Sequence, residues 1–103
     1  MLIMEKLKGK NRKYLRGLAH NLDPVVMVGF EGLTPAVIKV TKQALEDHEL
    51  IKVKFNKFKE QKKELSAELE NLTASEMIGM IGNVVIFYKQ NPDKEKRKII
   101  IPA

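Results

Sequence analysis

The sequence predicts a single domain of the α/β (α+β) class, with elements in the order αβαβαββ around a small mixed four-stranded sheet. Three observations carry this prediction. The chain has 103 residues, 44% of them hydrophobic, which suits one domain with a single modest core. Stretches of helical period alternate with short apolar runs. Glycine and proline stand between these segments, where turns are expected.

Residues 10–22 form the first expected helix. On a helix that turns ~100° per residue, one arc is apolar and holds Tyr14, Leu15, Leu18, Ala19 and Leu22. The opposite arc is basic and holds Arg12, Lys13, Arg16 and His20. We therefore expect an amphipathic helix whose basic face points to solvent.

A short strand and a glycine loop come next. Pro24 opens the apolar run 25–28, which is typical of a strand buried on both faces. The run ends in Gly29-Phe30-Glu31-Gly32, where two glycines allow a tight turn that a ligand can approach closely. The amides of the following helix point to the same place, which suits a phosphate. A GxxG loop clamps the nucleic-acid backbone in KH domains, although GxxG is also a common loop without that role.

The second helix begins at Thr34-Pro35, because threonine caps free amides and proline at the first helical position has no amide to satisfy. It should run to about Asp47. Residues 50–55 then alternate, with Ile51, Val53 and Phe55 on one face and Lys52 and Lys54 on the other. Two strands separated by one helix predict a parallel βαβ unit with a right-handed crossover.

The remaining elements are a helix and a hairpin. Leu65, Leu69 and Leu72 mark a third helix, entered through the lysine-rich run 57–63. Residues 77–81 and 84–88 read as strands, with Gly82-Asn83 as the turn between them. After a turn at residues 91–93, residues 99–101 are a candidate for a short edge strand.

The charge pattern favours an anionic partner. The chain carries a net charge of +6, and its bases concentrate in residues 1–16, 51–63 and 89–103. A generally solvated surface is the alternative interpretation. The apolar start, residues 1–4, is too short for a signal peptide or a membrane span. We therefore expect a cytoplasmic protein with no membrane partner.

Catalysis is poorly supported. The chain has no cysteine, which excludes a disulfide, a thiolate zinc site and a cysteine nucleophile. His20 and His48 have no neighbouring ligands at metal-binding spacing, and neither a Lys-Ser/Thr phosphate loop nor a nucleophile elbow is present. We expect no enzyme activity, no metal, no cofactor and no small-molecule substrate.

The sequence resembles the CRM domain, the YhbY-like family of RNA-binding proteins, from Leu7 to Pro102. The matching positions share one register and are Lys10, Arg12, Leu15-Arg16, Ala19-His20, Leu22, Pro24, Gly29, Gly32-Leu33-Thr34, residues 48–54, Ile81-Gly82 and Tyr88-Lys89. The resemblance implies a fold similar to the C-terminal domain of bacterial translation initiation factor three. It also implies RNA binding through a basic surface that includes the GxxG loop.

The resemblance further implies a role for the whole chain. Single-domain bacterial members look like assembly factors of the large ribosomal subunit, so the expected partner is ribosomal RNA in large-subunit precursors. Residues 1–103 would be one domain and a monomer, with a core at about 7–90 and a basic C-terminal extension at 91–103. The candidate RNA-binding residues are Lys10, Arg12, Lys13, Arg16, Gly29, Phe30, Gly32, Lys52, Lys54 and Lys89.

The chain departs from the family at several positions, and the loop departure keeps a second function open. The family loop usually carries a base after its first glycine, whereas this chain has Phe30-Glu31. Phe30 could stack on an unpaired base or contact a protein partner. Lys89 replaces a usual arginine and keeps only its charge. The alternative function is therefore a protein-interaction adaptor, which Phe30 and the acidic residues 46–49 would suit, with basic residues used for steering.

Overall fold

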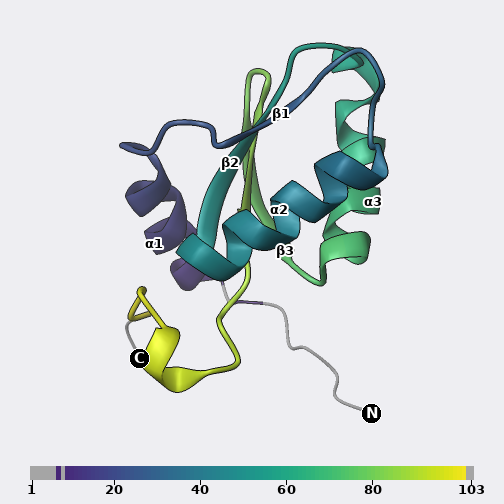
Figure 1. Ribbon diagram of the computed structural model, residues 1–103. Helices are drawn as coiled ribbons and strands as arrows, with labels where there is room; N and C mark the ends of the chain where they lie inside the picture. Colours follow the sequence, from purple (N-terminus) through teal and green to yellow (C-terminus); the bar gives the residue numbers. More distant parts are fainter. Residues whose placement is uncertain (1–6, 8, 102–103) are drawn as a thin grey trace.

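The computed structural model describes residue 7 and residues 9–101, apart from the side chain of Lys59. Its elements follow the expected αβαβαββ order (Figure 1). They are α1 (Gly9–Ala19), β1 (Val26–Val28), α2 (Pro35–His48), β2 (Leu50–Phe55), α3 (Lys62–Thr73), β3 (Glu76–Ile81) and β4 (Val84–Tyr88), with 3-10 turns at Lys59–Gln61 and Lys94–Lys96. The predicted α+β class is confirmed.

The four strands form one mixed sheet in the order β1-β2-β4-β3. β1 and β2 are parallel, as the βαβ unit predicts, and Val26 pairs with Val53. β4 runs antiparallel to both β2 and β3. The β3–β4 hairpin turns at Gly82, whose φ of 57° lies in the left-handed region that glycine tolerates best.

Helices cover both faces of the sheet, and each face has its own apolar cluster (Figure 1). The cluster beneath α2 and α3 is Val26, Val28, Leu45, Ile51, Val53, Phe55, Leu69, Val85 and Phe87. The cluster beneath α1 is Leu15, Ala19, Leu50, Ile78, Ile86 and Tyr88. Because successive side chains of β2 and β4 point to opposite faces of the sheet, these two strands contribute residues to both clusters.

The start of α2 is as predicted. The Thr34 hydroxyl oxygen accepts a hydrogen bond from the Val37 amide at 3.1 Å, and Pro35 occupies the first helical turn. This cap fixes where the chain leaves the glycine loop and enters the helix.

The expectation that the first strand is buried on both faces is wrong. β1 lies at an edge of the sheet, and α1 leaves Met27 open, so its side chain is 57% exposed. Only Val26 and Val28 are buried. An apolar run cannot by itself distinguish a central strand from an edge strand with one open face.

Three smaller expectations also need correction. α1 ends at Ala19, before Leu22. Leu72 is 43% exposed and contributes little to the core. Residues 99–101 form no strand, but Ile99 and Ile101 pack against the cluster beneath α1. Their apolar character serves burial of one sheet face rather than extension of the sheet.

Candidate nucleic-acid interface

The outer face of α1 presents exposed basic side chains. Lys10 and Lys13 are exposed and border a shallow hollow with Tyr14, Gly17 and Leu18. Because Leu15 and Ala19 are fully buried, these lysines lie on the side of the helix away from the sheet. The helix therefore offers positive charge to a ligand without involving its packed face.

Arg12 does not point freely to solvent, and that part of the prediction is wrong. Its guanidinium forms an ion pair with Glu76 at the start of β3 and donates to the Met77 carbonyl oxygen at 2.6 Å. Arg12 precedes Leu15 by three residues, which places it only ~60° around the helix from the buried face. The arginine joins α1 to the sheet, and its contribution there is structural.

Arg16 is exposed and lies over the edge strand β3. A Cβ at Gly79 would come within 2.9 Å of the Arg16 Cδ, so the glycine leaves room for the arginine side chain. A glycine within a strand often marks such a close approach. Gly79 was not predicted as a site residue, although this signal was present in the sequence.

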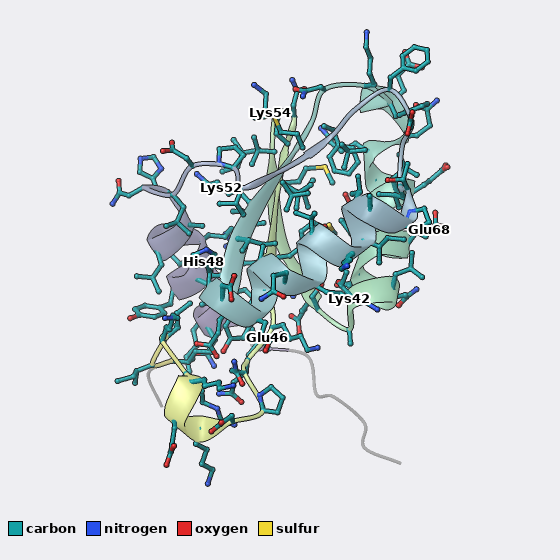
Figure 2. The ribbon with its side chains drawn as sticks, viewed as in Figure 1. Lys42, Glu46, His48, Lys52, Lys54 and Glu68 are labelled. Carbon is teal, nitrogen blue, oxygen red and sulfur yellow. The ribbon has the colours of Figure 1, made fainter. Side chains whose placement is uncertain are left out.

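Figure 2 labels Lys52 and Lys54 of β2. They alternate with Leu50, which packs in the cluster beneath α1, so they lie on the face of the sheet that carries α1. The Lys52 ammonium donates to the Leu22 carbonyl oxygen at 2.9 Å and so holds the segment that follows α1. Lys54 lies farther along the strand, beside Met27 of β1 and Val84 of β4. This part of the sheet face is open to solvent.

The GxxG loop is a tight turn in which the Gly32 amide donates to the Gly29 carbonyl oxygen at 3.1 Å. Gly32 has a φ of 73°, whereas the φ of Gly29 is not in the left-handed region. The backbone conformation of the turn therefore requires glycine at residue 32 but not at residue 29. Within the described residues, the amides of Phe30, Glu31 and Leu33 donate to no protein acceptor. Such amides beside a helix N-terminus suit an anion.

A second loop lies against this turn. The Asn56 amide donates to the Val28 carbonyl oxygen at 3.0 Å, and the Phe58 ring lies 3.6 Å from the position that a Cβ would take at Gly32. Lys57 between them is exposed. The lysine-rich run 57–63 predicts the entry to a helix, and no local sequence pattern indicates that this loop meets the GxxG turn.

Lys89 lies away from the GxxG turn. It follows the end of β4, which pairs with the start of β2, and lines a hollow with Lys42 and Asn91. The GxxG turn is at the opposite end of the sheet (Figure 1). The basic residues of the C-terminal segment therefore do not share one surface with the loop.

Glu49 organises the C-terminal segment from a buried position. Its carboxylate accepts hydrogen bonds from the amides of Asn91 at 2.7 Å, Lys98 at 2.6 Å and Ile99 at 3.0 Å. The expected acidic surface at residues 46–49 is therefore wrong at Glu49, whose side chain is fully buried. Burial and the Glu49 carboxylate raise the pKa of Tyr88 to about 12, against an opposing contribution from Arg97.

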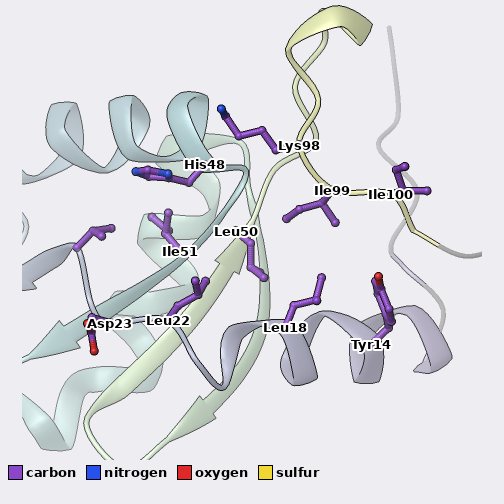
Figure 3. A pocket seen from close by; sticks show the side chains of 11 residues that line it. Tyr14, Leu18, Leu22, Asp23, His48, Leu50, Ile51, Lys98, Ile99 and Ile100 are labelled. Atoms are coloured by element: carbon purple, nitrogen blue, oxygen red, sulfur yellow. The ribbon is translucent and has the colours of Figure 1, made fainter.

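An apolar groove of about 600 Å³ lies between α1, the start of β2 and this segment (Figure 3). Its lining includes partly exposed side chains of Tyr14, Leu18 and Leu22 on one wall and Ile99 and Ile100 on the other. The Glu49 hydrogen bonds hold one wall in place.

The described part of the chain contains no group of three or more His, Cys, Asp or Glu side chains placed to hold a metal ion. No helix among residues 9–101 is long and apolar enough to cross a membrane.

Comparison with known proteins identifies the family. A model of the CRS1/YhbY (CRM) domain matches residues 7–89. A Haemophilus influenzae protein named "RNA-binding protein" is 37% identical over 100 residues, 96% of this chain and 98% of that protein. The Bacillus subtilis "Probable RNA-binding protein YqeI" is 36% identical over 97 residues, 93% of this chain and 99% of that protein. The chain belongs to the CRS1/YhbY (CRM) domain family, as the resemblance predicted.

A solved structure agrees with the fold. The solution structure of a Staphylococcus aureus protein, described as "a putative RNA binding protein", matches with a TM-score of 0.76 and 37% sequence identity. The match covers 94% of this chain and 100% of the other.

Proposed function

We propose that this protein binds structured RNA without catalysing a reaction. The observation that carries the proposal is a set of exposed cations, Lys10 and Lys13 on α1 and Arg16 above β3, in a chain whose relatives are named for RNA binding. Cations on a rigid helix can contact phosphates, which supply most of the affinity of such proteins. Lys54, farther along the sheet, and the free amides of the GxxG turn are further groups that can contact phosphates.

A salt titration tests this function. Contacts between cations and phosphates release counterions, so the logarithm of the affinity for a structured RNA should fall linearly with the logarithm of salt concentration. The purified protein should also carry ribonuclease-sensitive material that absorbs at 260 nm. A protein that binds no RNA at low salt, or whose affinity is the same at low and physiological salt, contradicts the proposal.

The RNA that we propose is ribosomal RNA in precursors of the large subunit, bound during assembly. The support is the likeness to small single-domain family members, because the chain covers 98% and 99% of the length of the two relatives above. Crosslinking in cells followed by sequencing of the bound RNA tests this finer assignment. If ribosomal RNA is not enriched, the assembly role fails while RNA binding itself can stand.

The apolar groove favours a second candidate function, an adaptor that docks on a protein. Its exposed side chains Tyr14, Leu18 and Ile100 would suit an apolar segment of a partner. Phe30 also suits an adaptor function, because its side chain is almost fully exposed. Ile100→Ser, an uncharged change on the wall of the groove that α1 does not form, separates the two functions. It should leave RNA affinity unchanged if RNA is the partner, and it should abolish recovery of the protein with ribosomal particles if a ribosomal protein is.

We extend the proposal to the whole chain. Residues 1–103 act as one RNA-binding unit, with a core at about 7–90 and the basic extension 91–103 held to it. We propose that this unit is a cytoplasmic monomer. Size-exclusion chromatography with light scattering, with and without RNA, tests the oligomeric state.

A further inference from the structure

Two exposed phenylalanines stand on the neighbouring loops where β1 and β2 end. Phe30, in the GxxG turn, is 82% exposed, and Phe58, in the loop between β2 and α3, is 41% exposed. The two loops adjoin, because the Asn56 amide donates to the Val28 carbonyl oxygen and the Phe58 ring lies 3.6 Å from the position that a Cβ would take at Gly32. An apolar ring left in water on each of two adjoining loops is a feature that core packing does not explain.

The backbone at Phe58 is unusual for its residue type. Its φ of 59° and ψ of 37° lie in the left-handed region, which bulky side chains rarely adopt. Asparagine or glycine would occupy this position with less strain. A ring kept in a disfavoured conformation at an exposed site is characteristic of functional loops.

The surroundings of the two rings carry positive charge. Lys57 precedes Phe58 and is exposed, Lys63 is exposed at the start of α3, and Lys54 precedes the loop on the open face of the sheet. Glu31 and Glu60 are the exposed acids beside them. Exposed aromatic rings among cations match the chemistry of single-stranded RNA, whose bases stack while its phosphates pair with lysine.

We propose that the surface formed by Phe30, Lys57 and Phe58 binds unpaired nucleotides of a structured RNA, with Phe58 stacking on a base. The inference rests on the proposed RNA binding and extends the site from the GxxG turn to the loop between β2 and α3. Gly32 has a specific part in it, because its φ of 73° forms the turn that lies beside the Phe58 ring. The ligand is RNA with unpaired bases rather than a continuous duplex, since only unpaired bases expose a face for stacking.

Two RNAs of equal length test the proposal, one a hairpin with an unpaired loop and the other a continuous duplex. Phe58→Asn removes the ring and suits the left-handed backbone, so the variant should fold at least as well as the wild type. It should bind the hairpin roughly five- to 150-fold more weakly, the effect of losing one stacked base, and bind the duplex unchanged. The salt slope should stay the same, whereas Lys57→Ala should make it shallower.

Two matched variants sharpen the result. Phe58→Tyr keeps an aromatic face and should retain the affinity, while Leu72→Ala removes an equally exposed apolar side chain, 43% exposed, from the far end of α3 and should change nothing. A fluorescent 2-aminopurine in the hairpin loop should be quenched by the wild type and by Phe58→Tyr but not by Phe58→Asn. Phe30→Ser provides an independent variant at a site too exposed to affect folding.

The outcomes distinguish this inference from the proposed function. One outcome is that the wild type binds both RNAs, while Phe58→Asn and Phe30→Ser each bind the hairpin as tightly as the wild type. That outcome refutes the stacking surface and leaves RNA binding itself intact. If Phe58→Asn weakens the hairpin and the duplex equally, no unpaired base is recognised and the inference fails as well. If the wild type binds neither RNA, the proposed function fails first.

Discussion

The guanidinium of Arg12 donates to the Glu76 carboxylate and to the Met77 carbonyl oxygen, and it thereby ties α1 to the first residues of β3. The side chains of Arg12 and Glu76 are 28% and 11% exposed, so solvent screens this ion pair less than it screens a pair on the open surface. The Leu7 amide donates to the same carboxylate at 3.2 Å. An arginine within a basic helix face thus secures the fold.

We predict that Arg12→Ala lowers the free energy of unfolding by about 1–3 kcal/mol, because it leaves a mostly buried carboxylate without its charged partner. Lys13→Ala, one residue away and exposed, should change stability by less than about 0.5 kcal/mol. Urea denaturation of both variants measures the difference. Equal stability of the two would show that the Arg12–Glu76 pair contributes nothing to the fold.

Arg16→Ala is the cleaner variant for RNA binding, and its RNA affinity should be lower than that of the wild type with the fold unchanged.

Glu49→Gln should release the C-terminal segment. The glutamine keeps the size of the side chain, but it has one carbonyl oxygen in place of a carboxylate that accepts three backbone amides. Amide hydrogen exchange at Asn91, Lys98 and Ile99 should accelerate by at least tenfold, while that in β2 and β4 should change less. Glu46→Gln, on the exposed side of α2, is the control. Unaltered exchange at the three amides would contradict this account.

The two glycines of the GxxG turn should respond differently to alanine. Gly32→Ala places a side chain at a φ of 73°, which costs about 1–2 kcal/mol, although the added Cβ would meet the Phe58 ring at an ordinary contact distance. Gly29→Ala meets no atom within 4 Å and should be neutral or slightly stabilising through the unfolded state. Thermal melts should therefore show a lower Tm for Gly32→Ala only. The reverse order would mean that the turn is not the one described.

Stability should fall in alkaline solution because of Tyr88. Its pKa is raised to about 12 in the folded protein, first by burial and then by Glu49, against about 10 in an unfolded chain. The folded state therefore holds this proton more tightly. The resulting stabilisation, roughly 3 kcal/mol, is complete below pH 10 and is lost as the pH rises to 12.

Tyr88→Phe isolates this effect. The Tyr88 hydroxyl is buried and has no hydrogen-bond partner in the described part of the chain, so its removal should cost little at pH 7. Denaturation of both proteins from pH 9 to pH 12 should show a steeper loss for the wild type, since lysine titration is common to both. Parallel curves would mean that Tyr88 ionises normally.

Local patterns predicted most of this fold because each element carries its own signal. The alternation of Ile51, Val53 and Phe55 placed β2, and Thr34-Pro35 placed the start of α2. What could not be predicted depends on contacts between distant segments. Arg12 meets Glu76 and Glu49 meets Ile99, and no periodicity indicates such pairs.

The candidate site shows the same division. The exposed lysines of α1 and the GxxG turn follow from local sequence, as does the basic face of β2. The meeting of Phe58 with Gly32 arises only because parallel pairing of β1 and β2 brings their ends to one edge of the sheet. Lys89 matched the family motif, but β4 runs in the opposite direction and places it at the other end.

Glu31 occupies the position in the GxxG turn where a phosphate would be repelled. Its side chain is exposed, next to the amides of Phe30, Glu31 and Leu33, which donate to no acceptor within residues 9–101. These amides and the N-terminus of α2 favour an anion. A carboxylate at Glu31 competes with RNA for the same positive potential.

We therefore predict that Glu31→Lys strengthens binding to structured RNA and makes its salt dependence steeper. The exchange removes a repulsion and adds one counterion-releasing contact, so the log-log slope should steepen by about one unit. Gly32 keeps the turn, and thermal melts should confirm an unchanged fold. Glu68→Lys, which makes the same charge change on the exposed face of α3, is the control and should have little effect. If both variants shift the affinity equally, the gain comes from net charge alone. If neither variant changes affinity or slope, the turn lies away from the phosphate backbone, and binding depends on α1 and Lys54.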